Sequence, residues 1–178
     1  MDAAGKKEYE ISGIVVSLGE MMKYAISRSS RTVALREEIR HVSNYLLIQK
    51  ERMEDKLEYE IDIPHQYESV QVPRLILQPL VENAIIHGIS PKGQGGRIHV
   101  RSWMEGRRIW ISVADTGRGM ARERLEEIRL ALARGEEKAT GVGVGNIYRR
   151  VHGMYRDGEV FIYSSEGRGT VVQMAFTP

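Results

Sequence analysis

The chain contains no cysteine, so it can form neither a disulfide nor a thiolate metal site, and this fits a reducing cytoplasm. It also lacks any apolar run near the roughly 20 residues that cross a bilayer, and its N-terminus has no secretory pattern. An excess of one charge is absent as well, since 26 basic and 24 acidic residues leave a formal net charge of +2. Because the basic residues are scattered among acidic ones, we expect a mixed solvated surface rather than a nucleic-acid interface.

Residues 1–55 carry the periodicity of two helices. Steps of alternately four and three residues connect Ile11, Val15, Leu18, Met22 and Ala25, and again Leu35, Ile39, Val42, Leu46, Gln49 and Met53. All of these residues are apolar except Gln49, which is a polar interruption. The polar stretch "SRSSRT" between them predicts a connection. Two short amphipathic helices leave one apolar face uncovered. We therefore predict that this face pairs with a second copy of the chain or packs onto the domain that follows.

From residue 56 onward the pattern predicts an α/β domain, 56–178. "KLEYEIDI" alternates as a strand before Pro64, and two hairpins are predicted, "RIHVRSWM" with "RIWISVAD" and "EVFIYSS" with "TVVQMAF". Helices are predicted over 74–87 (opened by Pro73), about 121–134, and from near 145 to 156. The expected fold is a two-layer α/β sandwich, a mixed, mostly antiparallel sheet with helices on one face, preceded by the helical segment 1–55.

Four polar or glycine-rich motifs interrupt this pattern. Asn83 lies in the apolar helical run "QPLVENAIIHG", "DTGRG" (115–119) follows a strand, "GVGVGN" (141–146) leads into a helix, and "GRGT" (167–170) lies in the last hairpin. Glycine-rich loops before helices present free N–H groups to phosphate, but they are also common in ordinary loops. No strand directly precedes residues 141–146, which excludes a dinucleotide-binding βαβ unit.

In this order, the four motifs resemble the ATP-binding fold shared by DNA gyrase, Hsp90, MutL and histidine kinases, over residues 74–176. "EEIRHVSNYLLIQKERMEDKLEYEIDIP" followed by "PRLILQPLVENAIIHGI" is similar to sensor histidine kinases of the LytS/YesM type, which extends the resemblance to about residue 35. The resemblance implies ATP and Mg²⁺ as ligands. Asn83 would coordinate Mg²⁺, Asp115 would accept a hydrogen bond from the adenine amino group, and Thr170 would fix the adenine end.

The resemblance also implies further site residues. Glu82 would support or activate catalysis, with a solvent-facing or capping position as the alternative. His87 could contact phosphate, with packing at the helix end as the alternative. The remaining residues placed around the nucleotide are Gly117, Gly119, Met120, Gly141, Val142, Gly143, Val144, Gly145 and Asn146. The stretch 120–140 would form a lid that the nucleotide orders.

One position favours a histidine kinase over related enzymes. Members of the superfamily that hydrolyse ATP, and its serine kinases, carry a glutamate four residues before the asparagine, on the same helix face, where it can act as a base. Here that position is Pro79, which has no ionisable group. A histidine acceptor needs less help, since neutral imidazole is already nucleophilic. A gyrase- or MutL-type ATPase and a non-catalytic nucleotide-sensing module remain the alternatives.

The phosphoaccepting segment of such kinases, similar to "NPHFxFN", is missing from residues 1–20. We therefore expect a fragment that donates the γ-phosphoryl group to a histidine outside it and does not phosphorylate itself. No two histidines have a zinc-ligand spacing. For the full-length protein the resemblance implies a membrane-anchored homodimer with a cytoplasmic catalytic domain that passes phosphate to a response regulator.

Overall fold

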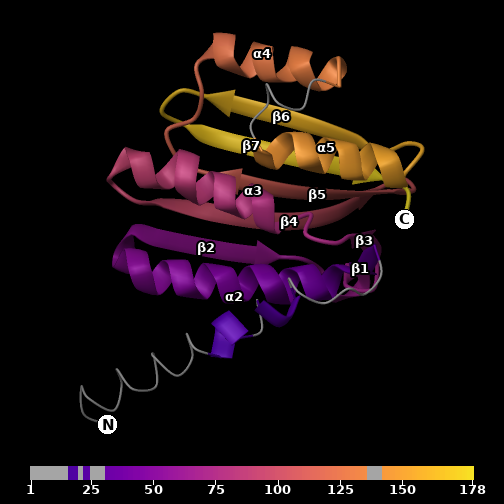
Figure 1. Ribbon diagram of the computed structural model, residues 1–178, viewed down its shortest axis with the longest axis horizontal. Helices are drawn as coiled ribbons and strands as arrows, with labels where there is room; N and C mark the ends of the chain where they lie inside the picture. The colour runs from indigo at the N-terminus through magenta and orange to yellow at the C-terminus, as the bar shows by residue number, and fades with distance from the viewer. Residues whose placement is uncertain (1–15, 20–21, 25–30, 136–141) are drawn as a thin grey trace.

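The computed structural model describes residues 16–19, 22–24, 31–135 and 142–178. Its centre is a five-stranded sheet in the order β2-β4-β5-β7-β6 (Figure 1). The strands are β2 (Leu57–Asp62), β4 (Gly96–Glu105), β5 (Arg108–Asp115), β6 (Glu159–Ser165) and β7 (Gly169–Phe176). β2 and β4 run parallel, and the other neighbouring pairs are antiparallel. The predicted mixed sheet and both of its hairpins are confirmed.

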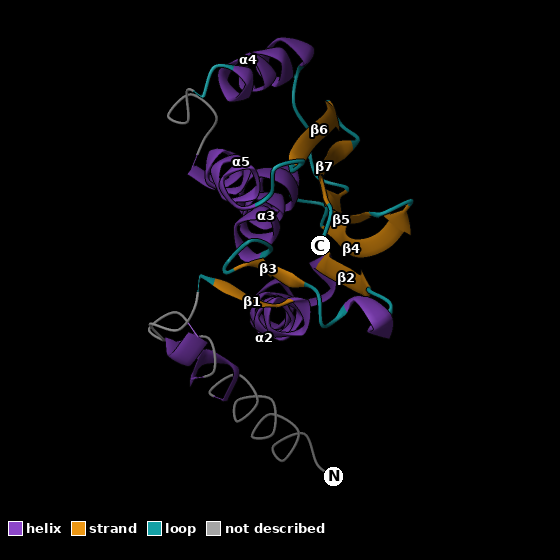
Figure 2. Ribbon diagram, turned by 90° about the vertical axis from the view of Figure 1, so that its right-hand side faces the viewer, coloured by secondary structure: helices purple, strands orange, loops and turns teal. Residues whose placement is uncertain are grey.

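Helices cover one face of this sheet (Figure 2). They are α2 (Leu35–Met53), α3 (Gln78–Asn83) and α5 (Val142–Met154), while α4 (Arg122–Ala133) lies beside the edge strand β6. Ile109, Ile111 and Val113 alternate along β5 into the core, as the period of a strand requires. The two-layer α/β sandwich is therefore confirmed. Short helical turns at Glu54–Lys56, His65–Tyr67 and Ser90–Lys92 complete the connections.

The helix that carries Asn83 begins later than predicted. Pro73 does not open it but ends the short strand β3 (Gln71–Pro73), which pairs with β1 (Thr32–Ala34) in a separate two-stranded sheet. Pro79 instead lies in the first turn of α3, where its missing N–H leaves no helical bond unmade. After Asn83 the helix continues as a π-helical segment, Ala84–Ile89.

The second predicted N-terminal helix is α2, and its apolar face packs onto the α/β layers. Leu35, Val42 and Leu46 are fully buried in the same core as the sheet. Of the first predicted helix only 16–19 and 22–24 are described, and these are helical. Pairing with a second copy, and a domain boundary near residue 56, stay predictions.

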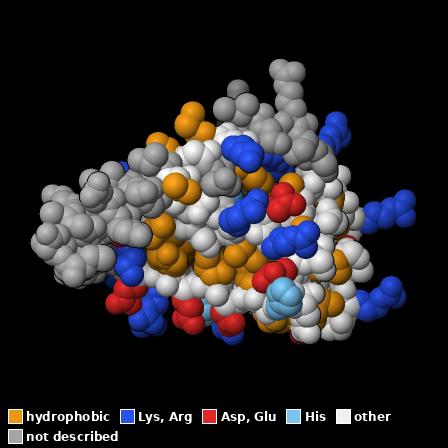
Figure 3. Space-filling model, turned by 90° about the horizontal axis from the view of Figure 1, so that it is seen from below, with side chains coloured by type: hydrophobic (Ala, Val, Ile, Leu, Met, Phe, Trp, Pro, Cys, Tyr) orange, Lys and Arg blue, Asp and Glu red, His pale blue; other side chains and the backbone are white. Residues whose placement is uncertain are grey.

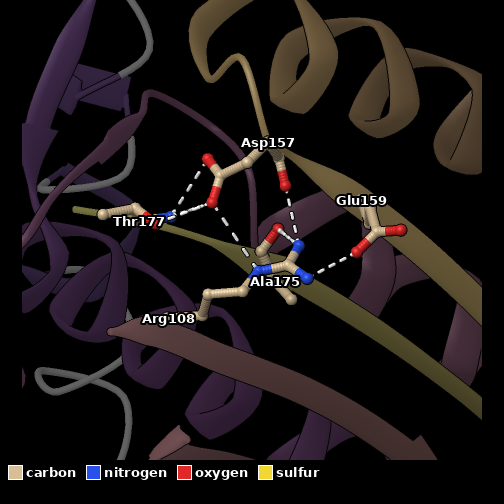
Figure 4. A network of polar contacts seen from close by, with 5 residues as sticks. All are labelled: Arg108, Asp157, Glu159, Ala175 and Thr177. Atoms are coloured by element: carbon tan, nitrogen blue, oxygen red, sulfur yellow. Dashed lines mark hydrogen bonds and ion pairs between the residues drawn. The ribbon is translucent and has the colours of Figure 1, made fainter. Parts of the chain in front are cut away.

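A polar cluster joins the C-terminus to the sheet (Figure 4). Arg108 Nη2 donates to the carbonyl oxygens of Asp157 (2.7 Å) and Ala175 (3.2 Å), and Arg108 Nη1 pairs with Glu159 at 2.6 Å. The hydroxyl and backbone N–H of Thr177 donate to the Asp157 carboxylate at 2.6 and 3.1 Å. These donors lower the pKa of Asp157.

The surface carries charges of both signs. On the face seen from below Figure 1, basic and acidic side chains are interspersed with apolar ones (Figure 3). None of the helices in the described part of the chain is both long and apolar enough to cross a membrane.

Candidate functional site

A cavity of about 330 Å³ opens between α3, the end of β5, and α4. Its walls are apolar and come from Leu80, Ala84, Val113, Met120, Ile128, Val144, Ile162 and Val172. Its polar side chains are those of Asn83, His87, Asp115, Arg118, Arg124 and Thr170. An apolar slot with a few converging polar groups is the usual form of a small-molecule site.

Among the described residues that line this cavity, only Asp115 carries a carboxylate. It is the last residue of β5 and lies opposite Thr170 of β7. Burial raises the pKa of Asp115 to about 6, although hydrogen bonds from backbone groups at Gly117 and Thr170 and the charge of Lys92 act in the opposite direction. The Gly117 N–H donates to Asp115 Oδ1 at 2.7 Å. A poorly solvated carboxylate at the base of an apolar slot is well placed to accept a hydrogen bond from a ligand amine.

The loop after Asp115 depends on its glycines for close packing. A Cβ at Gly117 would lie 2.2 Å from the carbonyl carbon of Gly88, so the two backbones are in direct contact. Gly119 has a φ of +65°, and a Cβ there would lie 2.0 Å from the carbonyl oxygen of Ser165. Gly119 lines the cavity, whereas Gly117 supports it from behind by packing on the π-helical segment.

The last hairpin is bonded to this loop. The Gly167 N–H donates to the Arg118 carbonyl at 2.6 Å, and the Met120 N–H donates to the Ser164 hydroxyl at 2.9 Å. That hydroxyl lies 2.9 Å from Thr170 Oγ1. Two motifs that are distant in sequence thus form one wall of the cavity.

Asn83, half-buried at the end of α3, faces the start of α5. A Cβ at Gly143 would lie 2.0 Å from Asn83 Nδ2, so only glycine allows α5 this close approach. The predicted glycine-rich loop is wrong for residues 143–145, because α5 already begins at Val142. The helix start lies over Asn83, and Val144 lines the cavity.

Other predicted residues lie elsewhere. Asn146 accepts a hydrogen bond from Arg149 at 2.6 Å and, like the buried Gly145, does not line the cavity. Gly141 and the side chain of Val142 lie outside the described residues.

Glu82 points toward α2 rather than into the cavity. Its carboxylate accepts a hydrogen bond from Gln78 Nε2 at 2.7 Å. After burial, the charge of Glu82 is the next cause that raises the pKa of Tyr45, which lies on α2. Glu82 is not among the described residues that line the cavity. A catalytic role for Glu82 stays a prediction.

Sequence reasoning missed the arginines of the cavity. Arg118 lies between the two glycines of "DTGRG", and its Nε donates to the carbonyl oxygen of His87 at 3.0 Å. Arg124 comes from α4, and no sequence motif marks this helix. The Arg129 side chain of α4 donates to the carbonyl oxygen of Ile162 at 2.6 Å, and this contact holds the helix beside the cavity. The two lining arginines bring positive charge suited to phosphate oxygens to the cavity, although Arg124 also pairs with Glu127 at 2.9 Å.

Comparisons with known proteins found family models and relatives that match this chain. A model of the family described as histidine kinase-, DNA gyrase B-, and HSP90-like ATPase matches residues 69–178, and one described as histidine kinase matches residues 2–57. An uncharacterized sensor-like histidine kinase of Staphylococcus epidermidis is 31% identical over 157 residues, which is 86% of this chain and 30% of that protein. The sensor protein kinase HptS of Staphylococcus aureus is 27% identical over 160 residues, 89% of this chain and 30% of that protein. The chain thus spans about 30% of the length of these relatives.

Solved structures share the fold. The histidine kinase domain of a blue-light activated kinase from Erythrobacter litoralis has a TM-score of 0.61 at 18% identity, covering 94% of this chain and 74% of that one. The histidine kinase ThkA in complex with the response regulator TrrA has a TM-score of 0.57 at 19% identity, covering 99% of this chain and 52% of that one.

Proposed function

Because the chain belongs to the family of histidine kinase-, DNA gyrase B- and HSP90-like ATPases, we propose that it is the ATP-binding catalytic part of a sensor histidine kinase. It would bind ATP with Mg²⁺ and present the γ-phosphoryl group to a histidine of a phosphoacceptor domain. The single observation that carries this proposal is the apolar slot closed by Asp115, which matches a flat base with one exocyclic amine. Thr170 lies opposite Asp115 and would border the same end of the base.

Asn83 is the residue that would hold Mg²⁺. The described residues contain no group of three or more His, Cys, Asp or Glu side chains that could hold a metal ion by themselves. A single amide oxygen from Asn83 fits Mg²⁺, because this ion keeps several waters and commonly takes one or two protein oxygens together with nucleotide phosphates. When bound, Mg²⁺ would supply neutralisation of the phosphate charge.

The cationic side chains of the cavity would complete the phosphate site. Arg118 and Arg124 would bind phosphate oxygens through their guanidinium N–H groups, and the exposed His87 lines the same cavity. The described part of the predicted lid, 120–135, holds α4 against β6 and contributes Arg124. Nucleotide-dependent closure of the lid is part of this proposal.

The acceptor histidine would come from outside the described residues. His41 is buried on α2 and pairs with Gln78, so it is not accessible to a nucleotide. Pro79 occupies the turn before Asn83 and provides no base for water activation. Transfer to an imidazole rather than hydrolysis is therefore the proposed reaction, with a response regulator, a homodimer and a membrane-anchored full-length protein as its setting.

Calorimetric titration with a non-hydrolysable ATP analogue and Mg²⁺ tests the proposal. We expect the wild type to bind and Asp115→Asn to bind about 100-fold more weakly, because hydrogen bonds to charged groups contribute about 1.5–3 kcal/mol. Asp157→Asn, a change of an exposed aspartate in the C-terminal cluster, should bind like the wild type. Absence of binding to the wild type would overturn the proposal. Steady phosphate release without an acceptor would favour the ATPase alternative.

A further inference from the structure

The turn over residues 74–77, between β3 and α3, has an unusual backbone. Leu75 has a φ of +55°, a left-handed conformation that non-glycine residues rarely adopt. Such a conformation persists only where the surrounding contacts require it, and it is common at active sites and switch regions. The contacts that require it here come from two charged side chains on different helices.

Glu38 of α2 holds one side of the turn. Its side chain is fully buried, and its two carboxylate oxygens accept hydrogen bonds from three consecutive backbone N–H groups. These come from Leu75 at 2.7 Å, Ile76 at 2.8 Å and Leu77 at 3.1 Å. These three N–H groups lie just before α3, which begins at Gln78, so this carboxylate fixes the turn that leads into α3 from another element.

Arg150 of α5 holds the opposite side of the turn. Its Nη1 donates to the carbonyl oxygens of Arg74 and Leu75, the second at 3.2 Å. Donors and acceptors of the same short turn are thus bound by two different helices. The position of α3 therefore depends on side chains that are not part of it.

Tyr24 connects this turn to the segment before α2, by which we mean the helical residues 16–19 and 22–24 that precede β1 and α2 in the chain. Its hydroxyl donates to Glu38 Oε1, and the guanidinium of Arg74 lies over its ring at 4.2 Å from the ring centroid. Burial, followed by the hydrogen bond to Glu38, raises the pKa of Tyr24, so its hydroxyl stays protonated as the donor.

Tyr24 is also connected to the start of α3 through His41. The ring of Tyr24 lies 4.4 Å from that of His41, and His41 Nε2 is bonded to Gln78 at the start of α3. Gln78 in turn donates to Glu82, the neighbour of Asn83. The contact of Tyr24 through Glu38 ends on the turn before α3, and the contact through His41 ends on α3 itself, the short helix that carries Asn83.

We propose that Tyr24 and Glu38 are positioning residues that couple the placement of the segment before α2 to the placement of Asn83. A fully buried carboxylate that loses one donor must find another, because water does not reach it. Withdrawal of Tyr24 would therefore rearrange the contacts that hold Leu75 in its strained conformation and would shift α3. Because the role of Asn83 as a Mg²⁺ ligand is part of the proposed function, this inference rests on that function.

The test uses the complete 178-residue chain and two readouts. The first is hydrogen exchange of the Leu75, Ile76 and Leu77 amides without nucleotide, which does not depend on the proposed function. The second is the ratio of nucleotide affinity with Mg²⁺ to that with a chelator, with Asn83→Ala defining the loss of the metal contact. The variants are Tyr24→Phe and Glu38→Gln, and the matched control is Tyr59→Phe, which removes a hydroxyl from β2.

We expect Tyr24→Phe to speed exchange of the three amides about tenfold or more and to lower the Mg²⁺-dependent affinity ratio by about tenfold, with Tyr59→Phe unchanged in both. Glu38→Gln should have the same effects more strongly, and if it fails to fold Tyr24→Phe still decides. Unchanged exchange and ratio in Tyr24→Phe would overturn the coupling. So would equal weakening with and without Mg²⁺, which indicates general destabilisation. A wild type that binds no nucleotide would refute the proposed function. Hydrogen exchange would still decide whether Tyr24 and Glu38 hold the turn over residues 74–77.

Discussion

Asp115 is a residue on which stability and binding make opposite demands. Its pKa is raised from 3.8 to about 6, so between these pH values the native state binds more protons than the unfolded state does. Stability contributed by this group therefore falls as pH rises through that window, and above pH 6 the desolvated carboxylate destabilises the fold. A residue that a ligand needs is thus kept at a cost to the free protein.

This conflict predicts a stabilising substitution. Asp115→Asn should raise the free energy of unfolding of the nucleotide-free protein at pH 8 by about 1–2 kcal/mol, because it removes a poorly solvated charge and keeps an acceptor for the Gly117 N–H. Thermal unfolding with and without nucleotide measures this, and the variant should lose the rise in midpoint that the wild type shows with ligand. Asp157→Asn should have the opposite sign, since Thr177 lowers the pKa of Asp157. A drop in midpoint for Asp115→Asn would contradict this account of its burial.

The same carboxylate predicts a pH dependence of binding. Adenosine affinity should fall as pH drops through about 6, because a protonated Asp115 is a poorer acceptor for the adenine amine. The loss should approach tenfold per pH unit in acid, measured by calorimetry between pH 5 and pH 8. Adenosine is the suitable probe because it has no phosphates, so the measurement reports contacts to the base and sugar without phosphate contacts. A flat profile for the wild type, matching that of Asp115→Asn, would remove Asp115 from the base site.

Among the elements, the strands of the large sheet and the helix α4 (Arg122–Ala133, predicted over about 121–134) were predictable, whereas the starts of α3 and α5 were not. The strands of the large sheet follow a period of two, and the sequence shows it. β1 and β3 have three residues each, too few for any period to appear. The start of α3 depends on Glu38 of another helix, and the start of α5 on its contact with Asn83, so neither is a local property.

The site divides in the same way. Asn83, Asp115 and Thr170 belong to motifs, and the structure brings them to one cavity as predicted. Arg124 and Ile128 reach that cavity only because α4 packs on β6, and no spacing in the sequence records this contact. Glu82 shows the converse, since its place beside Asn83 in sequence does not bring it into the cavity.

The contact between α5 and Asn83 predicts the effect of one methyl group. In Gly143→Ala the new carbon would lie 2.0 Å from Asn83 Nδ2, so the amide must rotate away. The free energy of unfolding should fall by only about 1–2 kcal/mol, whereas affinity for the nucleotide with Mg²⁺ should fall at least tenfold. Gly153→Ala is the control on the same helix, because a Cβ there has no atom within 4 Å, and it should stabilise by about 0.4–1 kcal/mol. Normal affinity in Gly143→Ala would show that the observed position of Asn83 is not needed.

For the whole molecule, one core joins the two predicted parts of the chain. Leu35, Val42 and Leu46 of α2 are fully buried with the strands and α3, on the other side of the predicted boundary at residue 56. Burying side chains of this size contributes about 1.5–3 kcal/mol each, so three of them approach the whole stability of a typical domain, about 5–15 kcal/mol. The boundary at residue 56 would then divide functions without dividing folding units.

Two truncations separate these alternatives. A fragment of residues 31–178 keeps β1 and α2 and should unfold cooperatively, because the core residues that precede the sheet are retained. A fragment of residues 56–178 loses them, together with the contacts of Glu38 to the turn before α3, and should show neither a cooperative thermal transition nor dispersed amide resonances. If it instead unfolded cooperatively and bound nucleotide like the longer fragment, residue 56 would be a true folding boundary. The contacts of α2 would then act on the position of Asn83 alone, because the core would be complete without them.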